Sequence, residues 1–237
     1  MKRYLIAAIF AIVIIFSLIA FLNISVTTRQ GINYQWSTIK IPLYLKVLNF
    51  FDRHYNYTEL VKRITYGCDT EKDKAIKILQ WTYKNLKKIP EGLPVIDDHI
   101  WYVIVRGYGT RDQFQDVFST LCNYARLPTF YLYLYSFDKT NRIPVSFVRI
   151  SGRWFIFDAY NGVYFINKEG ELVDAEAIRR DSAYTAVNTE NVMVTVDYDN
   201  FLKHLSEVKN RVLKRPAIQS PLRRIMFEFK QWRERKR

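Results

Sequence analysis

Apolar and polar residues follow a helical spacing in the first half of the chain. Apolar residues recur every three or four positions in residues 44–51 and again in 60–64, which predicts two short helices. A stronger helix is predicted over residues 71–86, because Thr70 and Asp73 have the spacing of a capping pair at its start.

The second half of the chain begins with one more predicted helix. After it, the spacing of apolar residues changes from the helical period to the two-residue period of strands. Thr110 and Gln113 form a second capping pair, so a helix is predicted from Arg111 to about residue 126. Short apolar and alternating runs follow, with turn signals at Ser151-Gly152 and Asn161-Gly162. They predict strands at 129–135, 145–150, 153–158, 163–166 and 192–196. Helices followed by antiparallel strands indicate an α+β fold, with helices packed on an antiparallel sheet.

The N-terminal apolar run has no polar face. Residues 4–22 are almost wholly apolar, and 19 residues at a rise of about 1.5 Å give about 28 Å, the thickness of a hydrocarbon core. We expect an uncleaved anchor in residues 1–23; a cleaved signal peptide is the alternative, although its apolar region is usually only about 7 to 15 residues long. Lys2 and Arg3 indicate a cytoplasmic N-terminus and an extracytoplasmic main domain on the plasma (inner) membrane. Residues 24–68 are then expected to be a polar stem, reaching to about residue 37, and the two short helices.

Charge adds one feature to this picture. The chain has 36 Lys and Arg against 23 Asp and Glu, and the excess is concentrated in residues 201–237, which have 12 basic and three acidic residues. Apolar residues at helical spacing in this segment predict basic amphipathic helices, with either a membrane or polyanion contact or a solvated tail. The contact residues would be Arg223, Arg224, Lys230, Trp232 and Arg233. Outside the membrane, nucleic acid is not an expected partner.

Cysteine and histidine give little support for metal or cofactor chemistry. Cys68 and Cys122 lack zinc-ligand spacing, although an oxidising compartment would permit a disulfide between them. The three His residues are scattered, and the chain has no glycine-rich phosphate loop. We therefore predict no metal and no cofactor.

Three segments resemble the transglutaminase-like core, which has a papain-like cysteine-protease topology. They are Tyr108-Gly109-Thr110-Arg111-Asp112-Gln113, then Asn123-Tyr124-Ala125-Arg126-Leu127-Pro128, and Gly152-Arg153-Trp154-Phe155-Ile156-Phe157-Asp158. The resemblance covers roughly residues 69–182, within an expected domain of 69–200. It implies a Cys at the start of a core helix, followed by a His and an Asp on successive strands.

Two of these three family positions hold other residues. The family's Cys falls on Arg111, while counting outward from the Ser151-Gly152 turn pairs Asp158 with Val145, where the His would stand. Arg111 cannot act as a nucleophile, and we expect it to pair with a carboxylate, preferably that of Asp158. The alternative for Asp158 is a local role in the turn that follows. The candidate cleft consists of Tyr108, Arg111, Asp112, Val145, Trp154 and Asp158.

We therefore expect a membrane-anchored, catalytically inactive domain of this kind. The resemblance implies a binding or scaffolding role in cell-envelope or exopolysaccharide processes, with an envelope polysaccharide or a partner protein as ligand. Two alternatives remain open. One is an active cysteine acyltransferase or peptidase that uses Cys68 or Cys122 with His99, and the other is a protein in which only the basic tail functions.

Overall fold

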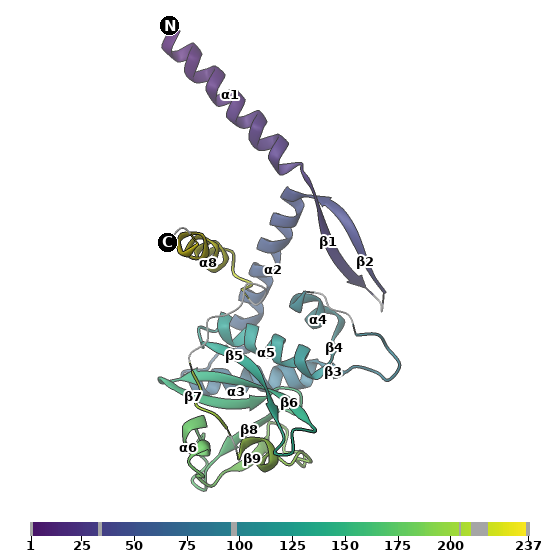
Figure 1. The fold of residues 1–237 in the computed structure, drawn as a ribbon, viewed down its shortest axis with the longest axis vertical. Helices are drawn as coiled ribbons and strands as arrows, with labels where there is room; N and C mark the ends of the chain where they lie inside the picture. The colour runs from purple at the N-terminus through teal and green to yellow at the C-terminus, as the bar shows by residue number, and fades with distance from the viewer. Residues whose placement is uncertain (1, 33–34, 96–98, 204, 210–217, 236–237) are drawn as a thin grey trace.

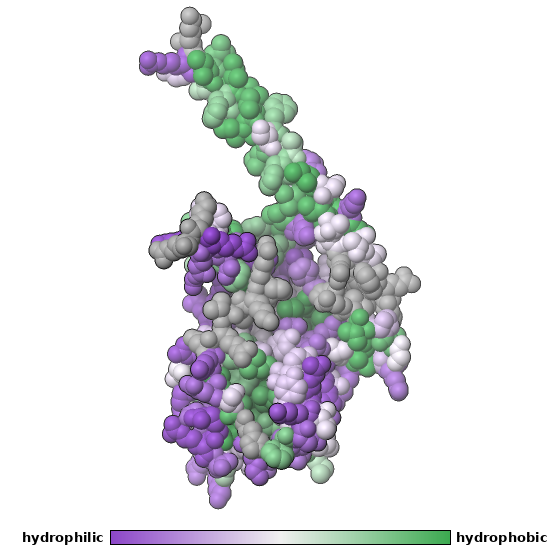
Figure 2. Space-filling view, in the orientation of Figure 1, coloured by the Kyte–Doolittle hydropathy of each residue, from purple (hydrophilic) through white to green (hydrophobic). Residues whose placement is uncertain are grey.

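The chain begins with an isolated apolar helix, passes through a hairpin and a long helix, and then enters a layered domain (Figure 1). The computed structural model describes residues 2–32, 35–95, 99–203, 205–209 and 218–235. The first helix, α1 (Lys2–Leu22), is long and apolar enough to cross a membrane. An 18-residue window within Arg3–Leu22 has a mean hydropathy of 3.2, and none of that window is buried inside the protein. Figure 2 shows it as a continuous hydrophobic rod, a property that membrane anchors and signal sequences share.

An antiparallel hairpin follows α1, where we had predicted a polar stem. Strand β1 (Ser25–Ile32) pairs with β2 (Gln35–Pro42) over their whole length. The stem prediction named no secondary structure, although β-branched residues such as Val26, Thr28 and Ile39 favour strands. The hairpin brings the chain back to its start, since the Leu43 amide donates to the Ile24 carbonyl at 2.9 Å.

Helix α2 (Leu43–Ile64) is one continuous element of 22 residues, not two short helices. The sequence prediction was interrupted by polar residues after Phe51, but Arg53, Tyr57 and Val61 are buried at intervals of one helical turn. Their spacing continues one buried face along the helix, which places its second half against the domain core.

Three further helices form one layer of the domain. Helix α3 (Glu71–Asn85) begins at Thr70, whose side chain accepts from the Asp73 amide, as predicted. The others are α4 (Ile100–Arg106) and α5 (Arg111–Tyr124), and the predicted start of α5 is confirmed. A short parallel pair, β3 (Lys87–Lys88) and β4 (Tyr108–Gly109), holds the chain ahead of α5.

The second layer is an antiparallel sheet of five strands in sequential order. Its strands are β5 (Thr129–Tyr135), β6 (Arg142–Ile150), β7 (Arg153–Asp158), β8 (Val163–Ile166) and β9 (Thr185–Asn188). The α+β class and the predicted hairpin turn are confirmed, with φ of 47° at Ser151 and 84° at Gly152. The strand predicted at 192–196 is wrong, because the fifth strand lies earlier, at β9.

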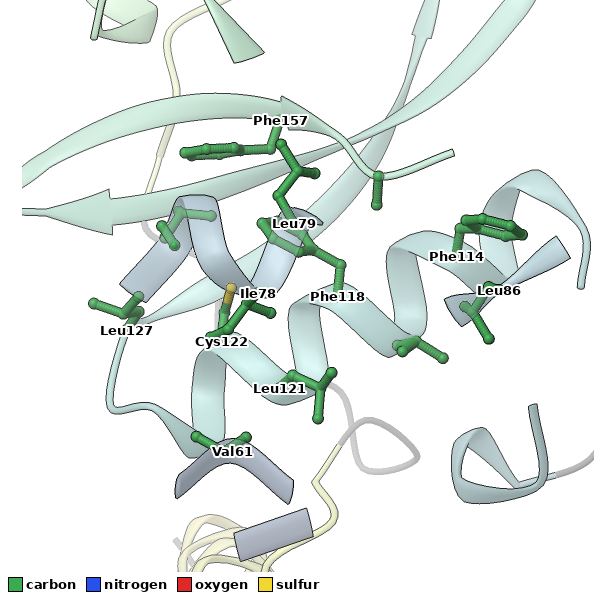
Figure 3. Packing of buried hydrophobic residues seen from close by; sticks show 14 of the residues in the cluster. Val61, Ile78, Leu79, Leu86, Phe114, Phe118, Leu121, Cys122, Leu127 and Phe157 are labelled. Carbon is green, nitrogen blue, oxygen red and sulfur yellow. The ribbon is translucent and has the colours of Figure 1, made fainter. Parts of the chain in front are cut away.

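Both faces of the sheet are covered. Helices α3 and α5 pack on one face, where alternate residues of β6 and β7, including Val148, join the first core cluster. Figure 3 shows Phe157 of β7 in this cluster. The other residues of these strands, including Val145 and Ile156, form a second cluster. This cluster is closed by α6 (Ala175–Arg179) and α7 (Asp199–Leu202). A side chain on β6 therefore reaches α5 only from every second position.

The predicted C-terminal amphipathic helix is α8 (Pro221–Glu234), which contacts α2. Its apolar residues are exposed, among them Leu222 at 74%, Met226 at 70% and Phe229 at 64%. The helix thus presents both basic and apolar residues to its surroundings.

Candidate functional site

The site begins at the N-terminus of α5, where the resemblance led us to expect Arg111 in place of a nucleophile. The Thr110 amide donates to Gln113 Oε1 at 3.1 Å, and Arg106 Nη2 donates to the same oxygen at 3.1 Å. The Asp112 carboxylate accepts from the Thr110 hydroxyl and from the Gln113 amide. An anionic side chain here stabilises the positive end of the helix dipole. Asp112 therefore offsets the charge of its neighbour Arg111.

Arg111 itself lies against an aromatic ring. Its Cζ is 5.1 Å from the centroid of the Tyr160 ring, and Lys88 Nζ is 4.6 Å from the same centroid. The Phe114 ring packs edge-on against the Tyr160 ring, with their centroids 5.1 Å apart. The expected ion pair with Asp158 is not formed, because Arg111 has no ion pair with any carboxylate in the described part of the chain. Cation–π contact replaces it.

Asp158 ends β7 and is enclosed by hydrogen-bond donors. Only 1% of it is exposed. Its Oδ1 accepts from Gln115 Nε2 at 3.2 Å and from the Tyr160 and Asn161 amides at 3.0 and 3.3 Å. Its Oδ2 accepts from Asn161 Nδ2 at 2.8 Å and from the Tyr198 hydroxyl at 2.7 Å. Both oxygens are thus occupied, and the local turn bonds that we had considered as an alternative are present.

Gln115 extends this polar cluster between α5 and the sheet. Its Oε1 accepts from the Ser146 hydroxyl at 2.7 Å, and Ser146 lies 3.1 Å from the Ser119 hydroxyl. Sequence reasoning missed Gln115, Ser119, Ser146 and Tyr198 as members of the site. The available signal was that Arg111, Gln115 and Ser119 recur every four residues, which gives α5 a polar stripe beside its apolar face.

Burial raises the pKa of the Asp158 carboxyl above its ordinary value, while the bonds from Tyr198, Asn161 and Tyr160 oppose that rise. An acid or base in catalysis must reach the proton of a substrate. Both Asp158 oxygens accept hydrogen bonds from the protein itself, and these bonds join the end of β7 to α5 and to the segment before α7.

The structure does not bring the whole predicted cleft together. Tyr108, Arg111 and Asp112 lie at the start of α5, and Asp158 joins that helix through Gln115. The observed pairing of β6 and β7 follows the predicted register from Ile150↔Arg153 to Ser146↔Phe157.

However, two cleft residues, Val145 and Trp154, belong to the second core cluster, on the sheet face away from α5. Trp154 packs edge-on against Phe130 with ring centroids 5.0 Å apart. Ser146, not Val145, faces α5. Val145 and Ser146 point to opposite faces of the sheet, because side chains alternate along β6. The expected His position, Val145, therefore does not face the expected Cys position, Arg111.

Both cysteines are free. Cys122 is fully buried in the first core cluster (Figure 3), and burial raises the pKa of its thiol far above the ordinary value. Cys68 is half-buried in the segment between α2 and α3. Neither sulfur contacts a His ring among the described residues.

The described histidines serve other contacts. His99 precedes α4, and burial together with the charges of Arg53 and Lys46 lowers its pKa to about 4. His54 Nδ1 lies 2.8 Å from the Tyr124 hydroxyl. His204 lies outside the described residues. Within the described ranges, no group of three or more His, Cys, Asp or Glu side chains is arranged to hold a metal ion.

Comparison with known proteins gives distant likenesses only. No protein-family model matches the chain, and no curated protein matches it. A solved structure from Cytophaga hutchinsonii, provisionally described as a cysteine protease, superposes with a TM-score of 0.41 and 20% identity. A structure from Parabacteroides distasonis, provisionally described as a protease, gives 0.37 and 14%, and one described as a TGase gives 0.38 and 13%.

These matches cover 56%, 74% and 56% of this chain, respectively. The chain in turn covers less than half of each of those structures, namely 46%, 41% and 43%. The similarity to cysteine-protease-like and transglutaminase-like structures is therefore distant and concerns the fold alone.

Proposed function

We propose that this protein is a membrane-anchored, non-catalytic binding or scaffolding module whose main domain lies outside the cytoplasm. The proposal is carried by two features together: a cationic Arg111 at the start of α5 and an enclosed Asp158 that makes no ion pair with it. A guanidinium occupies the helix start where acyl transfer would need a thiolate. The one remaining carboxylate of the family pattern already accepts bonds from five donors of its own chain.

The polar cluster around Asp158 supports a structural purpose for this region. It links α5, the end of β7 and Tyr198 by hydrogen bonds to one buried carboxyl group. Outside it, Arg111 and Lys88 present two cations beside the ring of Tyr160. Such a surface favours an acidic or carbohydrate ligand, since cations attract anions and aromatic rings stack on sugars. An envelope polysaccharide or an acidic partner protein fits this chemistry.

The membrane anchor is assigned to α1. Its length and composition suit a span, and Lys2 and Arg3 before it favour a cytoplasmic N-terminus. Retention of the full-length chain in carbonate-washed plasma membranes supports this assignment. A mature protein that lacks residues 1–22 and is released by the wash contradicts it and favours a signal sequence.

Thiol reactivity tests the absence of catalysis. The full chain in neutral detergent at pH 7.5 is treated with iodoacetamide, and labelling of the two cysteines is followed by mass spectrometry. We expect Cys68 to react no faster than an unstructured thiol and Cys122 to react only on unfolding, since the thiolate is the reactive form. Fast, selective labelling of either cysteine, lost in His99→Ala, supports the cysteine enzyme instead.

Ligand binding tests the positive half of the proposal. Envelope oligosaccharides and acidic peptides are screened against the full chain for thermal stabilisation. The variant Arg111→Gln should weaken any stabilisation found, whereas Arg149→Gln, an exposed arginine in β6, should not. Equal effects of the two substitutions on ligand stabilisation would show that the start of α5 is not part of the binding surface.

A further inference from the structure

A cavity of about 370 Å³ lies where α2, α5 and α8 meet. His54 lines it from α2, Thr120 and Tyr124 from α5, and Ser220 and Arg223 from the start of α8. Arg126, just after α5, lines it as well. The cavity is separate from the Asp158 cluster, since none of the residues around that carboxylate lines it.

The charges around the cavity are positive and not neutralised. Two guanidinium groups, those of Arg126 and Arg223, line it, and no acidic side chain does so among the described residues. Neither arginine forms an ion pair within the described ranges. The neighbouring Glu228 is paired with Arg224 at 2.8 Å. The positive potential of the cavity therefore favours binding of an anionic ligand.

Neutral donors add to this potential. The α8 cap residue Ser220 makes no side-chain capping bond, and Pro221 lacks an amide hydrogen, so the amides of the first turn are available to an anion. The hydroxyl of Thr120 lies in the cavity wall; this residue is only 6% exposed and has no hydrogen-bond partner in the described part of the chain. Its oxygen is open to the cavity, since it is not among the fully buried side-chain atoms that lack a partner. A ligand oxygen would satisfy the hydroxyl.

The surroundings of the cavity indicate where the anion comes from. The exposed apolar face of α8 begins at Leu222, next to Arg223, and continues through Met226 and Phe229. Figure 1 shows α8 beside α2, between α1 and the sheet. A helix with basic residues along an exposed apolar face suits the boundary between lipid headgroups and acyl chains. A lipid could place its phosphate in the cavity and its chains along this face.

We propose that the cavity binds the phosphate group of an anionic membrane lipid, and that the acyl chains lie along the apolar face of α8. The proposal rests on the membrane attachment proposed above. It makes α8 a second lipid contact beside α1, with Arg126, Arg223 and the Thr120 hydroxyl as phosphate ligands. Choline carries a compensating positive charge, so the same site should discriminate against zwitterionic lipids.

Calorimetric titration of the full chain in neutral detergent tests the site. The probes are monomeric dihexanoyl phosphatidylglycerol, dihexanoyl phosphatidylcholine and inorganic phosphate. We expect phosphatidylglycerol to bind at least about tenfold more tightly than the other two. The variant Arg126→Gln/Arg223→Gln should weaken its binding by about tenfold or more, because two charge-assisted contacts are lost. Thr120→Val, which keeps the side-chain shape, should weaken it several-fold.

The matched control is Arg63→Gln/Arg149→Gln, which removes the same charge from two exposed positions that do not line the cavity. Equal weakening in the control and the cavity variant overturns the proposal, as does unchanged binding in the cavity variant or in Thr120→Val. Phosphatidylcholine or free phosphate binding as tightly as phosphatidylglycerol overturns the lipid assignment. Detergent titration does not depend on whether α1 is retained or whether the domain is inactive, so failure here is distinct from failure of the proposed function.

Discussion

Tyr198→Phe should destabilise the protein through a single lost hydrogen bond. The Tyr198 hydroxyl donates to Asp158 Oδ2 at 2.7 Å, and the carboxylate is only 1% exposed. A hydrogen bond to a charged group contributes about 1.5 to 3 kcal/mol, and water cannot replace it at a buried oxygen. The ring, 5.1 Å from that of Phe165, is retained by phenylalanine. We expect a loss of about 2 kcal/mol in the free energy of unfolding at pH 7.

The pH dependence of this loss identifies Asp158 as its cause. Burial raises the pKa of Asp158 in the folded state, so the folded protein binds a proton more readily than the unfolded chain does. The stability contributed by the protonated form is present below the unfolded pKa and disappears as pH rises through the folded pKa. Removing the Tyr198 donor raises that folded pKa further. The difference between the variant and the wild type should therefore be largest above the folded pKa and shrink as pH falls through it.

Urea unfolding of the full chain in neutral detergent, followed by tryptophan fluorescence between pH 4 and pH 7, measures both effects. Tyr164→Phe is the matched control, because its hydroxyl on β8 makes no hydrogen bond within the described residues. The reasoning fails if the two substitutions cost the same at pH 7, or if the cost of Tyr198→Phe does not depend on pH.

Three further predictions concern a close backbone contact, a helix cap and the membrane contact of α8. Gly162→Ala should lower the free energy of unfolding by about 1 to 3 kcal/mol more than Gly152→Ala does. Both glycines have positive φ, so the backbone strain is similar. A Cβ at Gly162 would lie 2.7 Å from the Tyr83 ring, whereas a Cβ at Gly152 has no atom within 4 Å. Thr70→Ala should lower thermal stability by about 1 kcal/mol through loss of the α3 cap, and an unchanged melting temperature would contradict this. In vesicles with brominated acyl chains, Trp232→Phe should remove part of the fluorescence quenching if α8 lies in the membrane interface; unchanged quenching would place it elsewhere.

Local sequence signals predicted the helix starts and the central hairpin well. The pairs Thr70–Asp73 and Thr110–Gln113 determine where α3 and α5 begin, because capping is a contact between residues three apart. The Ser151-Gly152 turn fixed the register of β6 and β7 for the same reason. Features that depend on distant partners were predicted less well. Arg53 reads as a polar interruption in the sequence, yet it lies on the buried face of α2 because that helix packs on the domain.

The candidate site shows the same limit. Counting from the turn correctly paired neighbouring strands, but it could not tell which sheet face meets α5, since that depends on where the helix layer docks. Val145 was therefore chosen where Ser146 faces the helix. The partners of Asp158 were also hidden, because Gln115 and Tyr198 are 43 and 40 residues away in the chain. Only the bonds from residues just after β7 could be predicted from local sequence.

The closed hairpin after α1 limits how far the domain can travel. Its two strands occupy Ser25–Ile32 and Gln35–Pro42, yet the amide nitrogen of Leu43 lies 2.9 Å from the carbonyl oxygen of Ile24. These residues therefore add almost no length to the spacer between α1 and the domain. The spacer is the first half of α2, because the second half of that helix packs on the domain core. With α1 in the bilayer as proposed, the domain would sample only a thin shell next to the lipid surface. A binding partner would have to enter that shell, which favours membrane-bound or wall-proximal molecules over freely diffusing ones.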